Sequence, residues 1–351
     1  MARRLTRTTR RRATPEVAAT TSNVEELLLA AFERGDVTLE TGRYLITFKE
    51  GAVTEGIQAL SGFGLRTADA RDFVGQAIQD VDGADSVILP EIGVAVVAGE
   101  PFAARGLSVE TEIAADSAMA AIEPEYFVFA DSATDYLRGF ARATEAIVRD
   151  LGGVAELRMP EPEEEVQVLG ATWGLIKCKV PQSNRSGAGV KVAVLDTGMD
   201  RGHPDFAARS ITSQTFVGQP VQDLHSHGTH CIGTACGPQA PAGNTPRYGI
   251  GFRTSIFAGK VLSNSGSSVG GSVLAGMNWA IANRCTVISM SLGSQAPVQA
   301  AYTAAGQAAL NNNCLIIAAA GNAGSNTGAP ANSPTIMSVA SLDSNLTPSS
   351  F

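Results

Sequence analysis

The second half of the chain repeats one pattern: a short run of apolar and β-branched residues, followed by a stretch with helical spacing. Such runs occur at residues 190–195, 256–262, 286–290 and 315–319. Apolar runs without alternation are typical of strands buried on both faces, and helices between them predict crossover connections in a parallel sheet. We therefore predict a doubly wound α/β fold for residues 173–351, with ligands at the carboxyl ends of the strands.

The first half of the chain has a different order of elements. Strands are predicted at residues 44–48, 86–89, 93–98 and 121–129, and helices at residues 53–60 and 68–79. Together with a capped helix that begins at Asn23, these elements predict a small α+β domain over residues 23–130.

Two other segments are predicted to lie outside the domains. Residues 1–22 are polar and basic, and they carry too few apolar side chains to offset the entropy of ordering, so we predict a disordered basic arm. Residues 131–172 are predicted to hold an amphipathic helix near 135–151 and an acidic linker near 160–165.

Composition limits the class of protein. A chain of 351 residues can hold two domains, and 44% apolar with 17% charged residues indicates a soluble globular protein. A net charge of −8 argues against broad nucleic-acid binding, and no apolar run is long enough for a membrane span.

No secretory signal is visible after the N-terminal arginines, so localisation is left open. The five cysteines show no paired metal-ligand spacing, and Cys231 and Cys236, beside the histidines, are interpreted as buried reduced thiols rather than metal ligands.

Two motifs fall where a parallel sheet places its ligands. Asp196-Thr197-Gly198 ends the first apolar run, and His227-Gly228-Thr229-His230 follows further along. A carboxylate at the end of a strand can accept a hydrogen bond from an imidazole, whose other nitrogen then serves as general base to a nucleophile. We predict that Asp196 and His227 form such a pair, and that His225 and His230 have structural roles.

The order of the motifs carries a resemblance to a known family. Residues 192–198, then His203-Pro204-Asp205, then residues 227–234 resemble the Asp and His motifs of the subtilisin-like serine proteases. The cysteine after His230 resembles the proteinase K branch of that family. The resemblance implies a serine endopeptidase that hydrolyses polypeptides through an Asp-His-Ser triad.

Two segments resemble the substrate-binding walls of the family, which hold an extended substrate by strand addition. They are Gly266, Ser267 and Ser268 in the first segment, and Ser291, Leu292 and Gly293 in the second. The second segment is implied to line the pocket for the residue before the scissile bond. Residues 318–322 resemble the oxyanion-hole segment, in which the amide of Asn322 would stabilise the tetrahedral intermediate.

The first domain also takes part in the resemblance. Residues 43–49 and 121–125 resemble the first and last strands of subtilisin propeptides. This implies that residues 23–130 are an intramolecular propeptide that assists folding and blocks the active cleft of a zymogen. The maturation cut is then expected between Glu125 and Trp173.

The nucleophile of the family lies in a Gly-Thr-Ser-x-Ala segment, and no Gly-Thr-Ser occurs in the 351 residues. We therefore expect this chain to be the front portion of a protease precursor, with its catalytic serine beyond residue 351. The chain alone is expected to be inactive, and poorly folded or prone to aggregate because apolar sheet edges would be exposed. Two alternatives stay open: a binding or inhibitor protein without a nucleophile, and one half of a split protease.

No cofactor is implied for the reaction. Asp205 matches a position that binds calcium in many subtilisins, so a structural calcium ion is one expectation for that residue.

Overall fold

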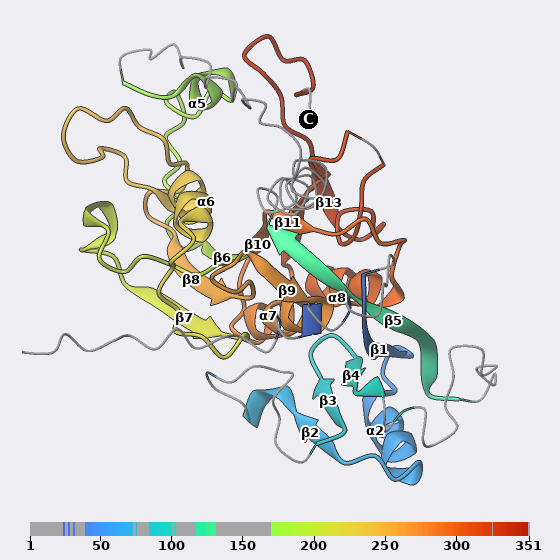
Figure 1. Ribbon diagram of the computed structural model, residues 1–351. Coiled ribbons are helices and arrows are strands. Elements are labelled where there is room, and N and C mark those ends of the chain that lie inside the picture. Colours follow the sequence, from blue (N-terminus) through green and yellow to red (C-terminus); the bar gives the residue numbers. More distant parts are fainter. Residues whose placement is uncertain are drawn as a thin grey trace, which may run out of the picture.

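The computed structural model describes residues 39–72, 84–99, 117–130, 170–324 and 326–349, together with Val24, Leu27, Leu28, Ala31, Gly75 and Phe102. The predicted basic arm and residues 131–169 of the predicted linker lie outside the described residues. The described chain forms two sheets, one largely antiparallel and one parallel, which lie next to each other (Figure 1).

The parallel sheet has the strand order β13-β12-β10-β6-β8-β7. The strands are β6 (Lys191–Asp196), β7 (Ile211–Thr215), β8 (Ser255–Lys260), β10 (Val287–Met290), β12 (Leu315–Ala319) and β13 (Met337–Val339). The chain starts at the interior strand β6, builds β7 and β8 on one side, and then crosses to the other side. The order therefore reverses beside β6, which makes the end of this strand a topological switch point.

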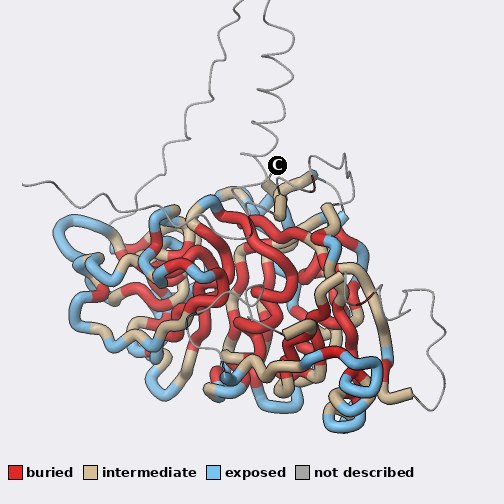
Figure 2. Tube along the Cα trace, turned by 60° about the horizontal axis from the view of Figure 1, so that its bottom comes forward, coloured by how far each residue is buried: buried red, intermediate tan, exposed pale blue. Residues whose placement is uncertain are grey.

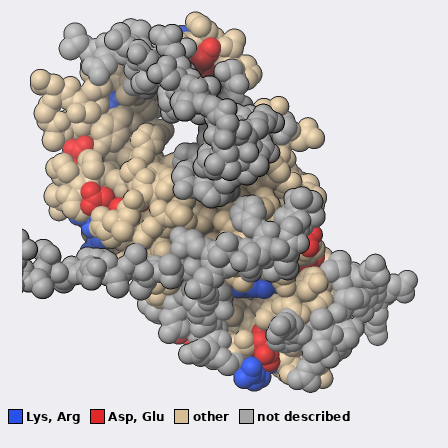
Figure 3. Space-filling model, viewed as in Figure 1, with Lys and Arg blue, Asp and Glu red and all other residues tan. Residues whose placement is uncertain are grey.

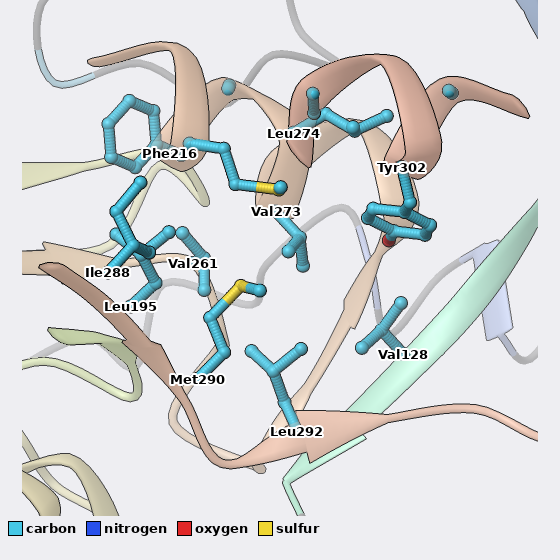
Figure 4. Close-up of a cluster of buried hydrophobic side chains, with 14 of the residues drawn as sticks. Val128, Leu195, Phe216, Val261, Val273, Leu274, Ile288, Met290, Leu292 and Tyr302 are labelled. Atoms are coloured by element: carbon cyan, nitrogen blue, oxygen red, sulfur yellow. The ribbon is translucent and has the colours of Figure 1, made fainter. Parts of the chain in front are cut away.

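Helices cover both faces of the parallel sheet. Val192 and Val194 of β6 pack with α6 (His227–Cys236), and Ala193 and Leu195 pack with α7 (Gly270–Ala282) and α8 (Ala300–Asn311) on the opposite face. Figure 4 shows Leu195 within the second cluster, and Figure 2 shows the buried chain through the middle of the molecule. Because each fully buried aliphatic side chain contributes about 1.5–3 kcal/mol, both faces of the sheet stabilise the fold. The predicted α/β class is confirmed.

The antiparallel sheet forms from the first part of the chain. Its own strands are β1 (Glu40–Phe48), β2 (Thr67–Asp69), β3 (Ser86–Leu89), β4 (Val94–Val97) and β5 (Met119–Ala130), in the order β5-β1-β4-β3-β2. Helix α2 (Val53–Gly62) covers one face, where Leu60 packs with Ile46 and Phe48 of β1. The strands predicted near 44–48, 86–89, 93–98 and 121–129 and the helix near 53–60 are confirmed.

The helix predicted over residues 68–79 is wrong at its start. Residues Thr67–Asp69 form β2, in which Ala68 pairs with Val87 of β3, and Ala70–Asp72 form one turn of 3-10 helix. The edge of a neighbouring strand offers backbone hydrogen bonds that outweigh a weak local helical preference.

Short elements complete the described chain. They are α5 (Trp173–Lys177), a 3-10 helix at Pro204–Phe206, β9 (Ser267–Val269) and β11 (Leu292–Gly293). The last strand of the parallel sheet, β13, leaves Met337 and Val339 each 49% exposed. Among the helices in the described ranges, none has the length and apolar character needed to cross a membrane.

Candidate active site

The pair predicted from the sequence forms at the switch point of the parallel sheet. Asp196 is the last residue of β6, and His227 is the first residue of α6. Asp196 Oδ1 lies 2.8 Å from His227 Nδ1, and the two side chains are 1% and 17% exposed. Since the carboxylate occupies Nδ1, Nε2 is the nitrogen left for proton transfer.

The backbone around the pair fixes its geometry. Thr197 donates its N–H to Asp196 Oδ1 at 2.7 Å, and its hydroxyl oxygen accepts the N–H of Gly228 at 2.9 Å. A Cβ on Gly228 would lie 2.4 Å from the carbonyl oxygen of Gly198. Only glycine therefore lets the start of α6 approach the end of β6 this closely.

The pKa of His227 depends on burial and on its two polar neighbours, Asp196 and Cys231. Burial lowers the pKa of His227, but the hydrogen bond and charge of Asp196 outweigh it, so the pKa lies above its ordinary value. Lys260 of β8 is fully buried and donates from Nζ to the carbonyl of Thr197 and to Asn264 Oδ1. Burial lowers the pKa of Lys260 to about 8, against the attraction of Asp223 and Asp196.

Cys231 belongs to the same cluster, although the sequence reasoning gave it no role there. Its Sγ lies 3.9 Å from His227 Nδ1, and its thiol also bonds with Ser291. One polar side-chain atom of each of Asp196, His227 and Cys231 lies within 4.8 Å of those of the other two. Burial raises the pKa of Cys231, which keeps the thiol protonated. The i, i+4 spacing from His227 on one helix was the signal available in the sequence.

The remaining cysteines are reduced. Cys236 is buried, as expected, and Cys285 and Cys314 are buried as well, whereas Cys178 is exposed. Cys178 directly follows the short helix α5 and lies at the molecular surface rather than in the core.

The two predicted substrate walls are brought together by a third strand. β5 of the antiparallel sheet runs between β9 and β11 and pairs antiparallel with both (Figure 1). Phe129 is opposite Ser267 on one side and Gly293 on the other, Ala130 is opposite Leu292, and the N–H of Ala130 donates to the carbonyl of Gly266 at 2.8 Å. Val128 lies beside Leu292 and Tyr302 in an apolar cluster (Figure 4).

Two glutamates of β5 accept hydrogen bonds from the backbone N–H groups at the amino ends of α8 and α7, the helices that follow the two walls. Glu123 accepts the N–H groups of Ala300 at 3.0 Å and Ala301 at 2.8 Å, at the start of α8. Burial raises the pKa of Glu123, and these hydrogen bonds oppose the shift. Carboxylates at these positions satisfy unpaired N–H groups and oppose the positive ends of the helix dipoles.

Glu125 caps the amino end of α7 in the same way, and its side chain is fully buried. It accepts the N–H of Gly271 at 2.7 Å and the hydroxyl of Thr41 at 2.6 Å, and Arg43 Nε lies 3.2 Å from it. A Cβ on Gly271 would lie 2.7 Å from Glu125 Oε1, so the missing side chain makes room for the carboxylate.

Asn322 and Ser291 line one cavity of about 290 Å³ at the carboxyl ends of β10 and β12. The cavity is also lined by residues 318–321, the rest of the predicted oxyanion segment. The side chain of Ser291 forms a hydrogen bond with the thiol of Cys231, and that thiol contacts the ring of His227. The cavity and the Asp196–His227 pair are therefore neighbours.

Asp205 lies apart from this cluster. Its Oδ1 accepts the N–H of Ala242 at 3.0 Å and its Oδ2 accepts the hydroxyl of Tyr248 at 2.5 Å. Both neighbours are donors rather than metal ligands, and Asp205 joins no group of three ligating side chains within the described ranges. These contacts give Asp205 a structural role, because they join the 3-10 helix at Pro204–Phe206 to the loop before β8.

Figure 3 shows no large charged patch among the described residues of this face, because the acidic and basic side chains are scattered among uncharged ones. The fold and the site together define an α/β protein with a carboxylate–imidazole pair at a switch point, beside two strands that hold an extended segment. Comparison with known families finds a match: residues 187–351 match the subtilase family.

Several relatives share this part of the chain. The alkaline serine protease ver112 of Corniculantispora psalliotae is 34% identical over 203 residues, which cover 53% of this chain and 50% of the relative. Subtilisin amylosacchariticus of Bacillus subtilis subsp. amylosacchariticus is 35% identical over 191 residues, covering 51% and 48%. A subtilisin of Bacillus pumilus is 34% identical over 184 residues, covering 49% and 64%. The chain thus spans about half the length of the first two relatives.

Proposed function

We propose that this chain is part of a serine endopeptidase precursor, with Asp196 and His227 as two members of a catalytic triad. The observation that carries the proposal is the 2.8 Å bond between Asp196 and His227 at the switch point, within the region that matches the subtilase family. Asp196 would hold the imidazole in one tautomer and stabilise the imidazolium, and His227 Nε2 would take the proton of a serine hydroxyl.

The amide of Asn322 is proposed as an oxyanion donor. Its cavity is shared with Ser291, whose segment pairs with the strand in the substrate position. A donor that is fixed before the reaction stabilises developing charge without reorganisation, which is why such groups contribute strongly to catalysis.

The proposed substrate is an extended polypeptide bound by strand addition between β9 and β11. β5 occupies this position through backbone hydrogen bonds, which carry affinity without regard to sequence. Val128 belongs to the same buried apolar cluster as Leu292 and Tyr302, so we propose a preference for an aliphatic residue at the corresponding substrate position.

We further propose that the N-terminal α+β unit, ending in β5, is an intramolecular propeptide that inhibits by occupying the cleft. Its support is the pairing of β5 with both walls and the capping of α7 and α8 by Glu125 and Glu123. Because Ala130 at the end of β5 pairs with Leu292, the neighbour of Ser291 beside Cys231 and His227, the maturation cut is proposed to fall within a few residues after Ala130. N-terminal sequencing of the processed protein would test this, since a start near Trp173 would contradict it.

The nucleophile is proposed to come from a segment outside these 351 residues. Within the described ranges, the polar contacts of His227 are with Asp196 and Cys231, and no serine hydroxyl is among them. The segment would add a Gly-Thr-Ser-x-Ala turn near His227 Nε2.

The test is to express the reading frame through and past the codon for Phe351, and to treat the protein with a fluorophosphonate. Labelling of the extended protein that His227→Ala abolishes would support the proposal. A stop codon after Phe351 would favour a binding or inhibitor protein or a split protease, and labelling of the 351-residue chain itself would overturn the missing nucleophile. Labelling that appears only after a second chain is added would identify the split enzyme.

A further inference from the structure

Asp223 is a buried carboxylate in the loop before α6, and the Asp–His pair does not use it directly. Its two oxygens nevertheless accept five hydrogen bonds from the residues on either side of that pair. The donors are Thr197 Oγ1, His225 N and Ser226 N to Oδ1, at 2.9 Å each, and Thr229 N at 2.9 Å and Thr229 Oγ1 at 2.7 Å to Oδ2.

These bonds connect the two segments that carry the pair. Thr197 directly follows Asp196 at the end of β6, whereas Ser226 and Thr229 flank His227 at the start of α6. One side chain is therefore tied to both segments.

The bond to Thr197 also sets the direction of a hydroxyl group. Because the Thr197 hydroxyl donates its hydrogen to Asp223, its oxygen lone pairs are left to accept the N–H of Gly228 at 2.9 Å. Without the carboxylate the hydroxyl could rotate, and the link between the two segments would lose its fixed direction.

Asp223 also holds a strained backbone in place. Ser226 precedes α6 with φ of 77°, a left-handed conformation that non-glycine residues seldom adopt, and its own side chain makes no cap. Such conformations persist where surrounding contacts over-determine them. Asp223 supplies those contacts by accepting the N–H groups of His225, Ser226 and Thr229.

The charges around Asp223 come from each neighbouring element. Lys260 attracts it from β8, and Asp200 and His225 lie in the adjoining loops; Asp196 also attracts Lys260 from the end of β6. Burial raises the pKa of Asp223, but hydrogen bonds led by those of Thr229 outweigh burial and hold the pKa below its ordinary value. The carboxylate is thus ionised at neutral pH and accepts at both oxygens.

We propose that Asp223 is a positioning residue that locks Asp196 and His227 into one hydrogen-bonded geometry through Thr197 and the first turn of α6. Its relevance to catalysis rests on the proposed protease function, but the lock itself is a property of the 351-residue chain. It can be measured without a nucleophile.

The experiment is an NMR titration of the four histidines in the full chain, with the signal of His227 assigned from its loss in His227→Ala. In Asp223→Asn the amide cannot accept at both positions, so the low-field imidazole N–H signal of the Asp196–His227 bond should broaden or vanish. The pKa of His227 should fall by about one pH unit.

Asp343→Asn is the matched control, because Asp343 is exposed and accepts the N–H groups of Asn345 and Thr347 and the hydroxyl of Thr347. It should leave both signals unchanged. A folded Asp223→Asn protein that keeps the low-field signal and the wild-type pKa would overturn the proposal, as would an equal shift in the control.

Thr197→Val decides the question if Asp223→Asn fails to fold. The change removes the hydroxyl between Asp223 and Gly228 and leaves the other bonds of the carboxylate in place. The pKa of His227 should again fall, and an unchanged titration would refute the lock. Fluorophosphonate labelling of the extended protein reports on the protease function separately, so the two proposals can fail independently.

Discussion

The hydroxyl of Thr197 and the N–H of Gly228 are joined by a hydrogen bond of 2.9 Å, and each residue directly follows one member of the Asp196–His227 pair. The contact fixes the distance between the end of β6 and the start of α6. The geometry of the pair is therefore set by neighbouring backbone as well as by the two side chains themselves.

Gly228→Ala should destabilise the protein by about 1–3 kcal/mol, because the new Cβ would meet the carbonyl of Gly198 at 2.4 Å. Denaturant unfolding of the full chain measures the change. Gly174→Ala in α5 is the matched control, since a Cβ there meets no atom within 4 Å. It should be neutral or slightly stabilising, and equal losses at both positions would show that the close approach at Gly228 does not matter.

His227→Ala should lower the turnover of the extended, labelling-competent protein by several orders of magnitude, because the general base is lost. His230 lies on the exposed side of the same helix, and its replacement by alanine should change turnover little. Peptide hydrolysis under saturating substrate compares the two variants. Comparable losses in both, with folding intact, would contradict the assignment of His227.

The pH dependence of activity should follow His227. A general base must be neutral, and Asp196 holds the pKa of His227 above its ordinary value of about 6.5, so kcat/KM should rise into the alkaline range. A profile that already levels off below neutral pH would be incompatible with this pair.

The contribution of His227 to stability should fall as the pH rises, whereas kcat/KM should rise. Because the pKa of His227 is higher in the folded than in the unfolded state, its contribution is fully present below about pH 6.5 and is lost as the pH rises through the folded value. The difference in free energy of unfolding between wild type and His227→Ala should therefore shrink as the pH rises. Taking the difference removes the contrary contribution of Lys260, whose pKa burial lowers to about 8.

Glu125→Gln should loosen the N-terminal unit from the α/β domain. The substitution leaves Arg43 without its carboxylate in a buried site, and breaking such pairs costs about 3–5 kcal/mol. Limited proteolysis of the full chain should cut residues 40–130 faster in this variant. Glu55→Gln, at an exposed position in α2, is the control and should not change the rate.

Parts of this site could be predicted because they depend on local pattern. Asp196 follows the apolar run at residues 190–195, and His227 opens a short motif at the start of a helix, so both can be placed from local pattern. Asp223, Lys260 and Cys231 were missed as members of the cluster, because a single charged or polar residue in a loop or strand carries no periodic signal. The helix predicted over residues 68–79 was wrong at its start for a related reason: the backbone partner of residues 67–69 is β3, which comes later in the chain and cannot be read from the local pattern.

The sequence by itself determined the parallel sheet, the burial of its strands on both faces, and the order of the motifs. Only the tertiary structure decided that β5 lies between β9 and β11, that Glu123 and Glu125 meet the amino ends of two helices, and that Asp223 joins the segments of Asp196 and His227. The reason is physical. Periodicity records which face of an element is buried, whereas a buried carboxylate is tolerated only where donors from distant segments converge on it.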